Sequence, residues 1–319
     1  MTCPFCPHST RRVGVTLIEL VLVLVVGGLI ATVAFRTFRS QQRSVGGTVA
    51  LAEMRAQLRQ GLHVLASELR AISPADGDVL AWTRTGIVLR SVIGSSVVCR
   101  RESDTTLVLP PLGVEHGDGP TSWLTMPQPG DSLRVLDEAR ELSASDDAWP
   151  AYEIYSLAPV AAGEECTRWP GDGPGPAPTL RIRLGGEARV PSTVSVGASI
   201  RIFRPARYEL YRSGDGSWYL GASECRAGRL PACSTIQPVS GPYRPLRRGG
   251  EGSGLELAYF DRFGDELDPD LADARHIARI DVTVRAESMP SSVWNGMVTR
   301  ALRDSLHRSV APRPQTGRK

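Results

Sequence analysis

The chain has 319 residues, of which 41% are hydrophobic and 22% are charged, and its net charge at pH 7 is +3. This composition is ordinary for a folded protein, and the 32 glycines and 24 prolines favour a body rich in loops and strands. A charge so close to neutral gives no general reason to expect nucleic acid or anionic lipid as a partner. The length allows two average domains, or one long helix followed by a large globular region.

An apolar segment at residues 15–35 follows Arg11, Arg12 and Gly14. As a helix that rises about 1.5 Å per residue, it would be roughly 31 Å long, which is enough to cross the hydrocarbon core of a bilayer. Glu19 is the one charged residue within the segment. Because an acidic side chain at the centre of a membrane helix costs about 2.5 to 3.5 kcal/mol, a carboxylate in the membrane indicates a function.

Two simpler interpretations fit this segment less well. A secretory signal peptide has a shorter apolar core that ends in a cleavage site of small residues, whereas here the small residue Gly14 precedes a longer run. An ordinary single-pass anchor accounts for the length and for the flanking charges. A single-pass anchor does not explain why the apolar segment contains the charged residue Glu19.

The hexapeptide from Gly14 to Glu19, GVTLIE, resembles the processing site of type IV prepilins and type II secretion pseudopilins. The resemblance implies that a prepilin peptidase cuts between Gly14 and Val15 and methylates the new amino terminus. It also implies that Glu19, the fifth residue of the mature chain, pairs with the amino terminus of a neighbouring subunit and sets the axial stagger. Mature chains of the family most often begin with Phe, and Val15 departs from that pattern.

Four cysteines follow the leader, residues 1–14, in a region that the resemblance places outside the cytoplasm. They are Cys99, Cys166, Cys225 and Cys233. An even number of cysteines in an oxidising compartment is typical of disulfide bonds, and four allow three pairings. The short loop between Cys225 and Cys233 favours a local bridge, which leaves Cys99 to pair with Cys166.

A single apolar stripe marks the next segment. Its residues recur at spacings of three and four, as on one face of a helix, and they are Leu51, Met54, Leu58, Leu62, Leu65, Leu69 and Ile72. Ser73-Pro74 ends the pattern, and Gly46-Gly47 is a weak point or bend within it. We predict one helix, or two nearly continuous ones, over residues 15–72, whose first half spans lipid and whose second half lies on a sheet. A coiled-coil partner is the alternative explanation of the stripe.

From residue 76 onward, short β-branched runs bounded by Gly, Ser and Asp indicate strands. The expected strands are residues 86–93, 96–99, 105–109, 133–136, 152–157, 179–184, 200–203, 207–212, 218–220, 255–260 and 277–284. The run at 179–184 alternates apolar and charged residues, as expected of a sheet with one face in water.

These elements predict an α+β, pilin-like fold, in which a long N-terminal helix, transmembrane in its first half, packs on an antiparallel β-sheet domain. The expected divisions are a leader at 1–14, a transmembrane helix at 15–35, its amphipathic continuation at 36–73, a β-rich domain at 74–310 and a disordered basic tail at 311–319.

An acidic loop is a weaker candidate for a metal site. Asp261, Asp265 and Asp268 offer oxygens of the kind that calcium prefers. Their spacing fails the EF-hand pattern, because Glu266 stands where that pattern has glycine. A solvated hairpin loop is the simpler explanation, and we expect no metal.

Three arginines, Arg244, Arg247 and Arg248, would suit a phosphate backbone, but no stacking aromatic residues are interleaved with them. The histidines are isolated, and the sequence has no HExxH motif and no nucleophile elbow. We therefore expect no catalytic residue, no enzyme activity and no cofactor.

The segments at residues 208–211, 255–264 and 280–285 are similar to the larger minor pilins of the W type and to the J-type minor pseudopilin of type II secretion. The resemblance implies a minor pilin-like subunit that initiates or caps a pilus or pseudopilus filament. A J-type minor pseudopilin is one alternative, and a tip adhesin or DNA-binding module on a pilin anchor is another.

The same resemblance implies a place and a set of partners. The protein would cross the bacterial inner membrane once, with its globular domain outside the cytoplasm, and then enter the filament. Its partners would be the prepilin peptidase and methylase, other pilin or pseudopilin subunits and the inner-membrane assembly platform. Nucleic acid is not an expected partner.

Overall fold

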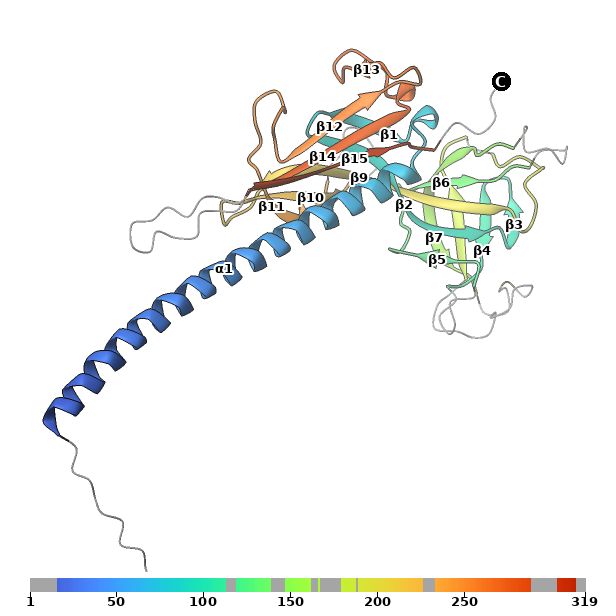
Figure 1. Ribbon diagram of the computed structural model, residues 1–319. Coiled ribbons are helices and arrows are strands. Elements are labelled where there is room, and N and C mark those ends of the chain that lie inside the picture. Colours follow the sequence, from blue (N-terminus) through green and yellow to red (C-terminus); the bar gives the residue numbers. More distant parts are fainter. Residues whose placement is uncertain are drawn as a thin grey trace, which may run out of the picture. The chain divides into compact units, whose positions relative to one another are not determined.

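The computed structural model describes residues 16–112, 119–138, 147–161, 166, 179–187, 189–225, 233–287 and 303–313, apart from the side chains of residues 40, 43, 44, 46 and 47. It has the predicted α+β architecture, in which a long N-terminal helix is followed by antiparallel sheets (Figure 1). The chain divides into two units, residues 1–53 and residues 54–319.

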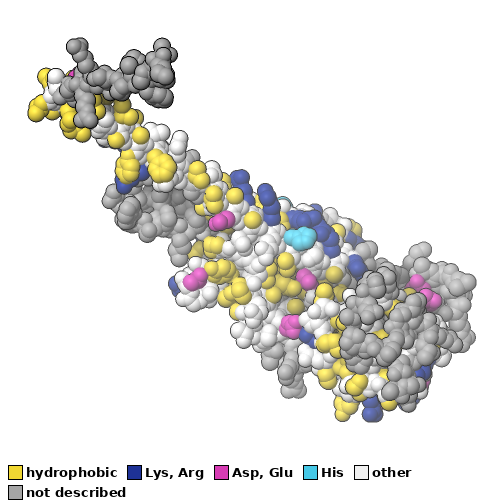
Figure 2. Space-filling view, turned by 90° about the horizontal axis from the view of Figure 1, so that it is seen from below, with side chains coloured by type: hydrophobic (Ala, Val, Ile, Leu, Met, Phe, Trp, Pro, Cys, Tyr) yellow, Lys and Arg dark blue, Asp and Glu magenta, His cyan; other side chains and the backbone are white. Residues whose placement is uncertain are grey.

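The helix α1, Leu17–Ala71, is 55 residues long and continues without a break through Gly46-Gly47. Of the two predicted possibilities, the structure therefore has the single helix. Its segment Leu17–Arg39 is long and apolar enough to cross a membrane. The apolar side chains of this segment are exposed, Leu17 to 84% and Leu29 to 63%, so it is not the buried helix of a soluble core (Figure 2).

In the second unit, the last part of α1 buries the predicted apolar stripe. Its members there are each at most 8% exposed and are Met54, Leu58, Leu62, Leu65, Leu69 and Ile72. Burying one such side chain completely contributes about 1.5 to 3 kcal/mol. Because the stripe is covered by this chain's own sheets, a coiled-coil partner is not needed to explain it.

Two residues, Pro74 and Gly77, shape the segment that follows α1. Pro74 disfavours helical backbone in the residue before it, and it opens the short 3₁₀ helix η1, Pro74–Asp76. Gly77 follows with a φ of 77°, a left-handed conformation that glycine adopts without steric cost. The chain then turns directly into the first strand.

The larger sheet is antiparallel at every pairing. Its strands follow the order β1-β2-β9-β6-β7-β8-β4-β3, with β10 on β9, β11 on β10 and β5 on β2. Their bounds are β1 Val79–Thr83, β2 Gly86–Val97, β3 Arg100–Ser103, β4 Thr106–Leu109, β5 Ser122–Trp123, β6 Ser132–Val135, β7 Ala151–Pro159, β8 Leu180–Leu184, β9 Ser199–Arg212, β10 Trp218–Glu224 and β11 Gln237–Tyr243.

The smaller sheet has the order β13-β12-β14-β15 and is also antiparallel. Its strands are β12 Leu255–Phe260, β13 Glu266–Leu267, β14 Arg279–Glu287 and β15 Arg303–Val310, and the 3₁₀ helix η2, Ala274–His276, precedes β14. An ion pair of 2.7 Å joins Arg55 of α1 to Asp304 of β15.

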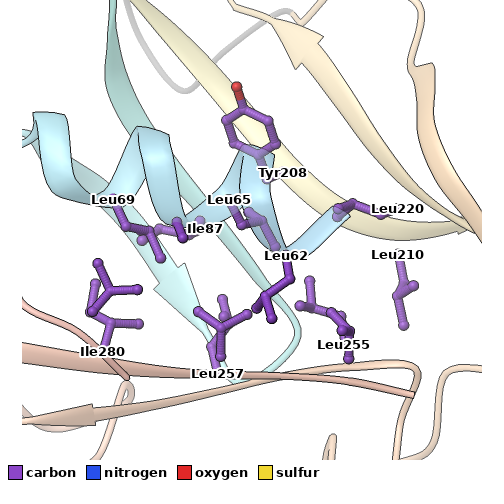
Figure 3. Packing of buried hydrophobic residues seen from close by; sticks show 14 of the residues in the cluster. Leu62, Leu65, Leu69, Ile87, Tyr208, Leu210, Leu220, Leu255, Leu257 and Ile280 are labelled. Atoms are coloured by element: carbon purple, nitrogen blue, oxygen red, sulfur yellow. The ribbon is translucent and has the colours of Figure 1, made fainter. Parts of the chain in front are cut away.

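One core is shared by α1 and both sheets. Figure 3 shows Leu62, Leu65 and Leu69 of the helix among side chains of the two sheets. The larger sheet contributes Ile87, Tyr208, Leu210 and Leu220, and the smaller sheet contributes Leu255, Leu257 and Ile280. A second core lies within the larger sheet around Leu107, Leu133, Ile154, Ile182 and Ile202.

The structure differs from the predicted strands in several places. Residues 86–93 and 96–97 join in β2, and residues 200–203 and 207–212 join in β9, which continues through Pro205. The carbonyl of Pro205 still accepts a hydrogen bond from the amide of Cys225, at 2.7 Å. Six strands, β1, β3, β5, β11, β13 and β15, are not predicted from the sequence. Of these, β3, β5 and β13 have at most four residues, and β11 and β15 are rich in polar residues, proline or glycine. Strand β1 is apolar, and its five residues carry no alternating pattern.

The predicted disordered tail also begins too early. Pro312 is buried, and the amide of Arg313 donates to the carbonyl of Ile72 at 2.9 Å. The first three residues of the expected tail, 311–313, are therefore held against the end of α1. The remaining residues of the tail lie outside the described part of the chain.

Candidate functional site

Glu19 lies in the first turn of α1 and is bound to Thr16, the residue before the helix. The amide and the hydroxyl of Thr16 both donate to Oε2 of Glu19 at 3.0 Å. The amide of Glu19 approaches the hydroxyl of Thr16 at 3.4 Å. This reciprocal arrangement is a capping box, and the sequence pattern Thr-x-x-Glu at residues 16–19 was sufficient to predict it.

The cap gives Glu19 a local role in addition to the predicted one. An acidic residue in the first turn is favourable because the positive end of the helix dipole lies there. Both bonds from Thr16 go to Oε2, and among the described residues Oε1 accepts no hydrogen bond. A carboxylate has about four acceptor positions, so the capped Glu19 retains acceptors for a further donor. Gly14 and Val15, the predicted cleavage pair, lie outside the described residues.

Two disulfide bonds join the four cysteines in the pairs that the short loop favoured. Cys225 bonds to Cys233, eight residues away, and Cys99 bonds to Cys166, at a separation of 67 residues. With the apolar N-terminal helix, the disulfides indicate a secreted or membrane-anchored domain outside the cytoplasm.

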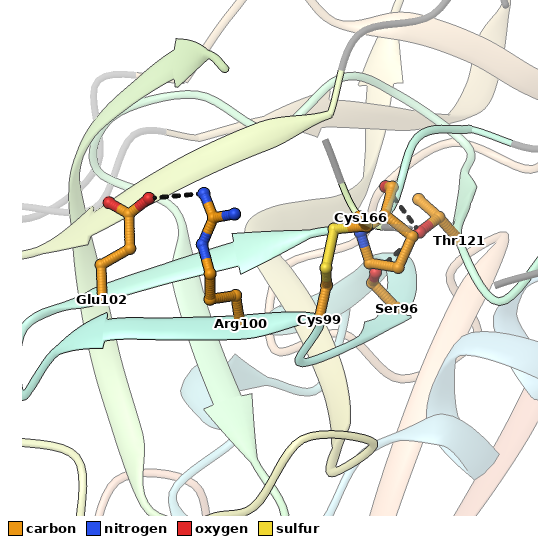
Figure 4. The surroundings of a disulfide bond; sticks show 7 residues. Ser96, Cys99, Arg100, Glu102, Thr121 and Cys166 are labelled. Atoms are coloured by element: carbon orange, nitrogen blue, oxygen red, sulfur yellow. Dashed lines mark hydrogen bonds and ion pairs between the residues drawn. A yellow bond between two sulfur atoms is a disulfide. The ribbon is translucent and has the colours of Figure 1, made fainter. Parts of the chain in front are cut away.

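The Cys99–Cys166 disulfide lies where β2 leads into β3 (Figure 4). Beside it, the hydroxyls of Ser96 and Thr121 are 2.7 Å apart, and that of Thr121 donates to the carbonyl of Pro110 at 2.9 Å. The disulfide and these bonds fasten connecting segments to the end of β2.

The acidic loop places its carboxylates in turns. Asp261 accepts from the amides of Phe263 and Asp265, at 2.8 and 2.9 Å, and Asp268 accepts from the amide of Asp270 at 3.0 Å. Within the described part of the chain, no three His, Cys, Asp or Glu residues are grouped as metal ligands. The carboxylates of this loop therefore serve turn formation in the structure.

A pocket of about 310 Å³ opens between β2, β9 and β10. Its most polar group is Arg204, which is buried and binds Asp131 through two bonds of 2.9 Å and Glu224 through a third of 2.9 Å. These bonds engage the guanidinium, so it is committed to the fold rather than to a ligand.

Next to this pocket, Glu68 of α1 is partly buried against the larger sheet. The hydroxyl of Ser91 donates to its carboxylate at 2.5 Å. Burial raises the pKa of Glu68, against the opposing effect of hydrogen bonds from Ser91 and Tyr208. Folding therefore shifts the protonation equilibrium of Glu68 towards the neutral form.

A hydroxyl, an imidazole and a carboxylate meet on the smaller sheet. Thr283 and His307 are cross-strand partners, with Nδ1 of His307 3.0 Å from the hydroxyl, and Nε2 is 4.0 Å from Asp281. His307 is more than half exposed, and Asp281 is also 3.3 Å from Arg279. The group is a polar cross-strand contact on a surface open to solvent.

The structure gives the three arginines near residue 245 different surroundings. Arg244 approaches Glu287 at 3.6 Å, and the backbone of Arg247 takes part in a turn closed by Ser253. Arg248 is exposed.

Comparison of the chain with models of protein families, with curated proteins and with solved structures finds no match.

Proposed function

We propose that this protein is a minor type IV pilin-like structural subunit, which initiates or caps a pilus or pseudopilus filament after its leader is removed. The observation that carries the proposal is the position of Glu19. It lies in the first turn of an exposed helix of membrane length, five residues after Gly14. The capping box with Thr16 would also accept an uncharged glutamine. A helix that only anchors and caps therefore does not need a charged residue in lipid, where an acidic residue is costly.

The chemistry of the mature terminus supports a pairing role. Cleavage after Gly14 would create a positive amino group at Val15, and methylation would keep its charge. An unpaired charge is costly in a low-dielectric membrane, and a contact between opposite charges of two subunits removes much of that cost. Thr16 engages only one oxygen of Glu19, so the carboxylate retains acceptors for the amino group of a neighbour.

The rest of the chain supports an outward structural role. The last part of α1 lies in the core of the β-rich unit, and two disulfides suit an oxidising compartment. The second unit comprises residues 54–319, and so large a body would crowd a repeating shaft. We therefore assign a scarce subunit, whose partners are the prepilin peptidase and methylase, other pilin subunits and the inner-membrane assembly platform.

The test is the composition of sheared filaments from cells that produce the full chain. Quantitative mass spectrometry should find the protein in the filaments at low abundance, with an amino-terminal peptide that begins at N-methyl-Val15. Protein that stays in the membrane fraction with Met1 intact would refute the proposal. In a deletion strain, loss of twitching would indicate a pilus, and loss of protein export would indicate a secretion pseudopilus.

A further inference from the structure

Two arginines face each other across neighbouring strands of the larger sheet. In the pairing of β6 with β9, Arg134 is directly opposite Arg201, and the adjacent Leu133 and Ile202 point into the core on the other face. Directly opposed residues have Cβ atoms about 4.5 to 5.5 Å apart, and like charges at such positions are destabilising. Negative charge on the face of the sheet that carries Arg134 and Arg201 would therefore stabilise this part of the fold.

Arg134 obtains that charge from within the chain. Its guanidinium lies 2.6 and 3.3 Å from the two carboxylate oxygens of Asp78, which is 1% exposed. It also lies over the ring of Phe203, 5.2 Å from the centroid. Arg90 approaches the same carboxylate at 3.8 Å, so Asp78 is already shared between two cations.

Arg201 has no such partner. No carboxylate of the described residues lies within ion-pair distance of it, and its guanidinium lies over Trp149, 4.7 Å from the ring centroid. Arg313 belongs to the same neighbourhood, because its amide donates to the carbonyl of Ile72 and the amide of the next residue, Ser73, donates to Asp78, the carboxylate that binds Arg134. Burial, the charge of Arg313 and the charge of Arg134 together lower the pKa of Arg201.

Among the residues that the structure describes, the charges around Arg201 do not balance. Four cations, Arg90, Arg134, Arg201 and Arg313, are opposed by the carboxylates of Asp78 and of Asp76, which is 3.9 Å from Arg134. Within the described part of the chain, positive charges at this place thus exceed negative ones by about two. The free cations among these described residues are Arg201, on the larger sheet, and Arg313, on the segment that leaves the smaller sheet.

We propose that Arg201 and Arg313 form a binding site for a small oxyanion of the phosphate or carboxylate type. The planar guanidinium groups suit such a ligand because each presents two parallel N–H donors to two oxygens. Ser95, which is exposed and directly opposite Arg201 on β2, adds a hydroxyl on the same face, and Trp149 forms an apolar wall. The bound anion would relieve the repulsion and tie residues 311–313 to the larger sheet.

The test uses the full chain in detergent micelles, with inorganic phosphate or acetate as the probe and sodium chloride of equal ionic strength as the reference. Calorimetric titration should detect phosphate binding to the wild type, and phosphate should raise its melting temperature above that in chloride. Arg201→Gln and Arg313→Gln should each weaken binding about tenfold to a hundredfold, the loss expected for a hydrogen-bonded charged contact. Acetate acting as well as phosphate would assign a carboxylate ligand, and phosphate acting alone would assign a phosphate.

The matched control is Arg183→Gln. Arg183 is also on the larger sheet and lies over an aromatic ring, that of Tyr155 at 5.9 Å, but no arginine is paired opposite it. This change should leave phosphate binding as in the wild type. If Arg201→Gln lowers the melting temperature equally in phosphate and in chloride, Arg201 serves only to pack on Trp149 and the site does not exist. Wild-type protein that responds identically to phosphate, acetate and chloride would also overturn the proposal.

Discussion

Replacing Glu19 by glutamine separates helix capping from charge pairing. A glutamine can still accept the bonds that Thr16 donates, at 3.0 Å each, because the capping box tolerates Glu or Gln at this position. It removes only the charge. The complementary change, Thr16→Ala, removes the capping hydroxyl and keeps the carboxylate.

The two roles predict different free-energy costs for Thr16→Ala and Glu19→Gln. If Glu19 acts only as a cap, Thr16→Ala costs about 1 kcal/mol, roughly fivefold, and Glu19→Gln costs less. If Glu19 pairs with the amino terminus of a neighbour, Glu19→Gln leaves that amine unpaired in lipid at a cost of about 3 kcal/mol or more, which is over a hundredfold in an equilibrium constant. We expect the second result, with Glu19→Leu behaving like Glu19→Gln.

The assay is incorporation per filament, measured by quantitative mass spectrometry on sheared filaments. It must be normalised to the processed protein in the membrane, because the subunit is expected to be scarce. Both variants should insert and be cleaved normally, as the mass of the amino-terminal peptide will show. Wild-type incorporation of Glu19→Gln, together with a loss for Thr16→Ala, would refute pairing and leave the cap as the role of Glu19.

Three further outcomes are expected. Gly14→Val should block cleavage, because the peptidase needs a small residue there, and intact-mass analysis that finds the mature chain would contradict this. Cys99→Ser should lower the free energy of unfolding by roughly 4 kcal/mol and Cys225→Ser by roughly 2.6 kcal/mol, because their disulfides span 67 and 8 residues. If urea unfolding shows the larger loss for Cys225→Ser, loop entropy is not the cause. Burial raises the pKa of Glu68 above its unfolded value, so its neutral form contributes stability that is present below about pH 4 and is lost as the pH rises through the folded pKa. Glu68→Gln still accepts the hydrogen bond from Ser91. As the pH rises from about 4 to about 7, its free energy of unfolding should therefore increase relative to that of the wild type. A difference in free energy of unfolding between variant and wild type that is the same at both pH values would disprove this.

The parts of this protein that were predictable from its residues are those decided by neighbours in the chain. The length of the apolar run, the stripe from Met54 to Ile72 and the stop at Pro74 depend on spacings of a few residues, and α1 has all three. The capping box at Thr16 is equally local, because both of its residues lie within the pattern Thr-x-x-Glu. The Cys225–Cys233 disulfide agrees with the short loop between its cysteines.

Tertiary structure decided everything that depends on partners far away in the sequence. Strand β2 pairs with β9 across more than a hundred residues, and β3 and β11 are strands only because a neighbour completes their hydrogen bonds. No local pattern places Arg134 opposite Arg201, since that contact depends on the register of two strands whose own sequences are unremarkable. Composition and spacing determine which segments can be helix or strand, whereas register and shared burial determine which charges end up side by side.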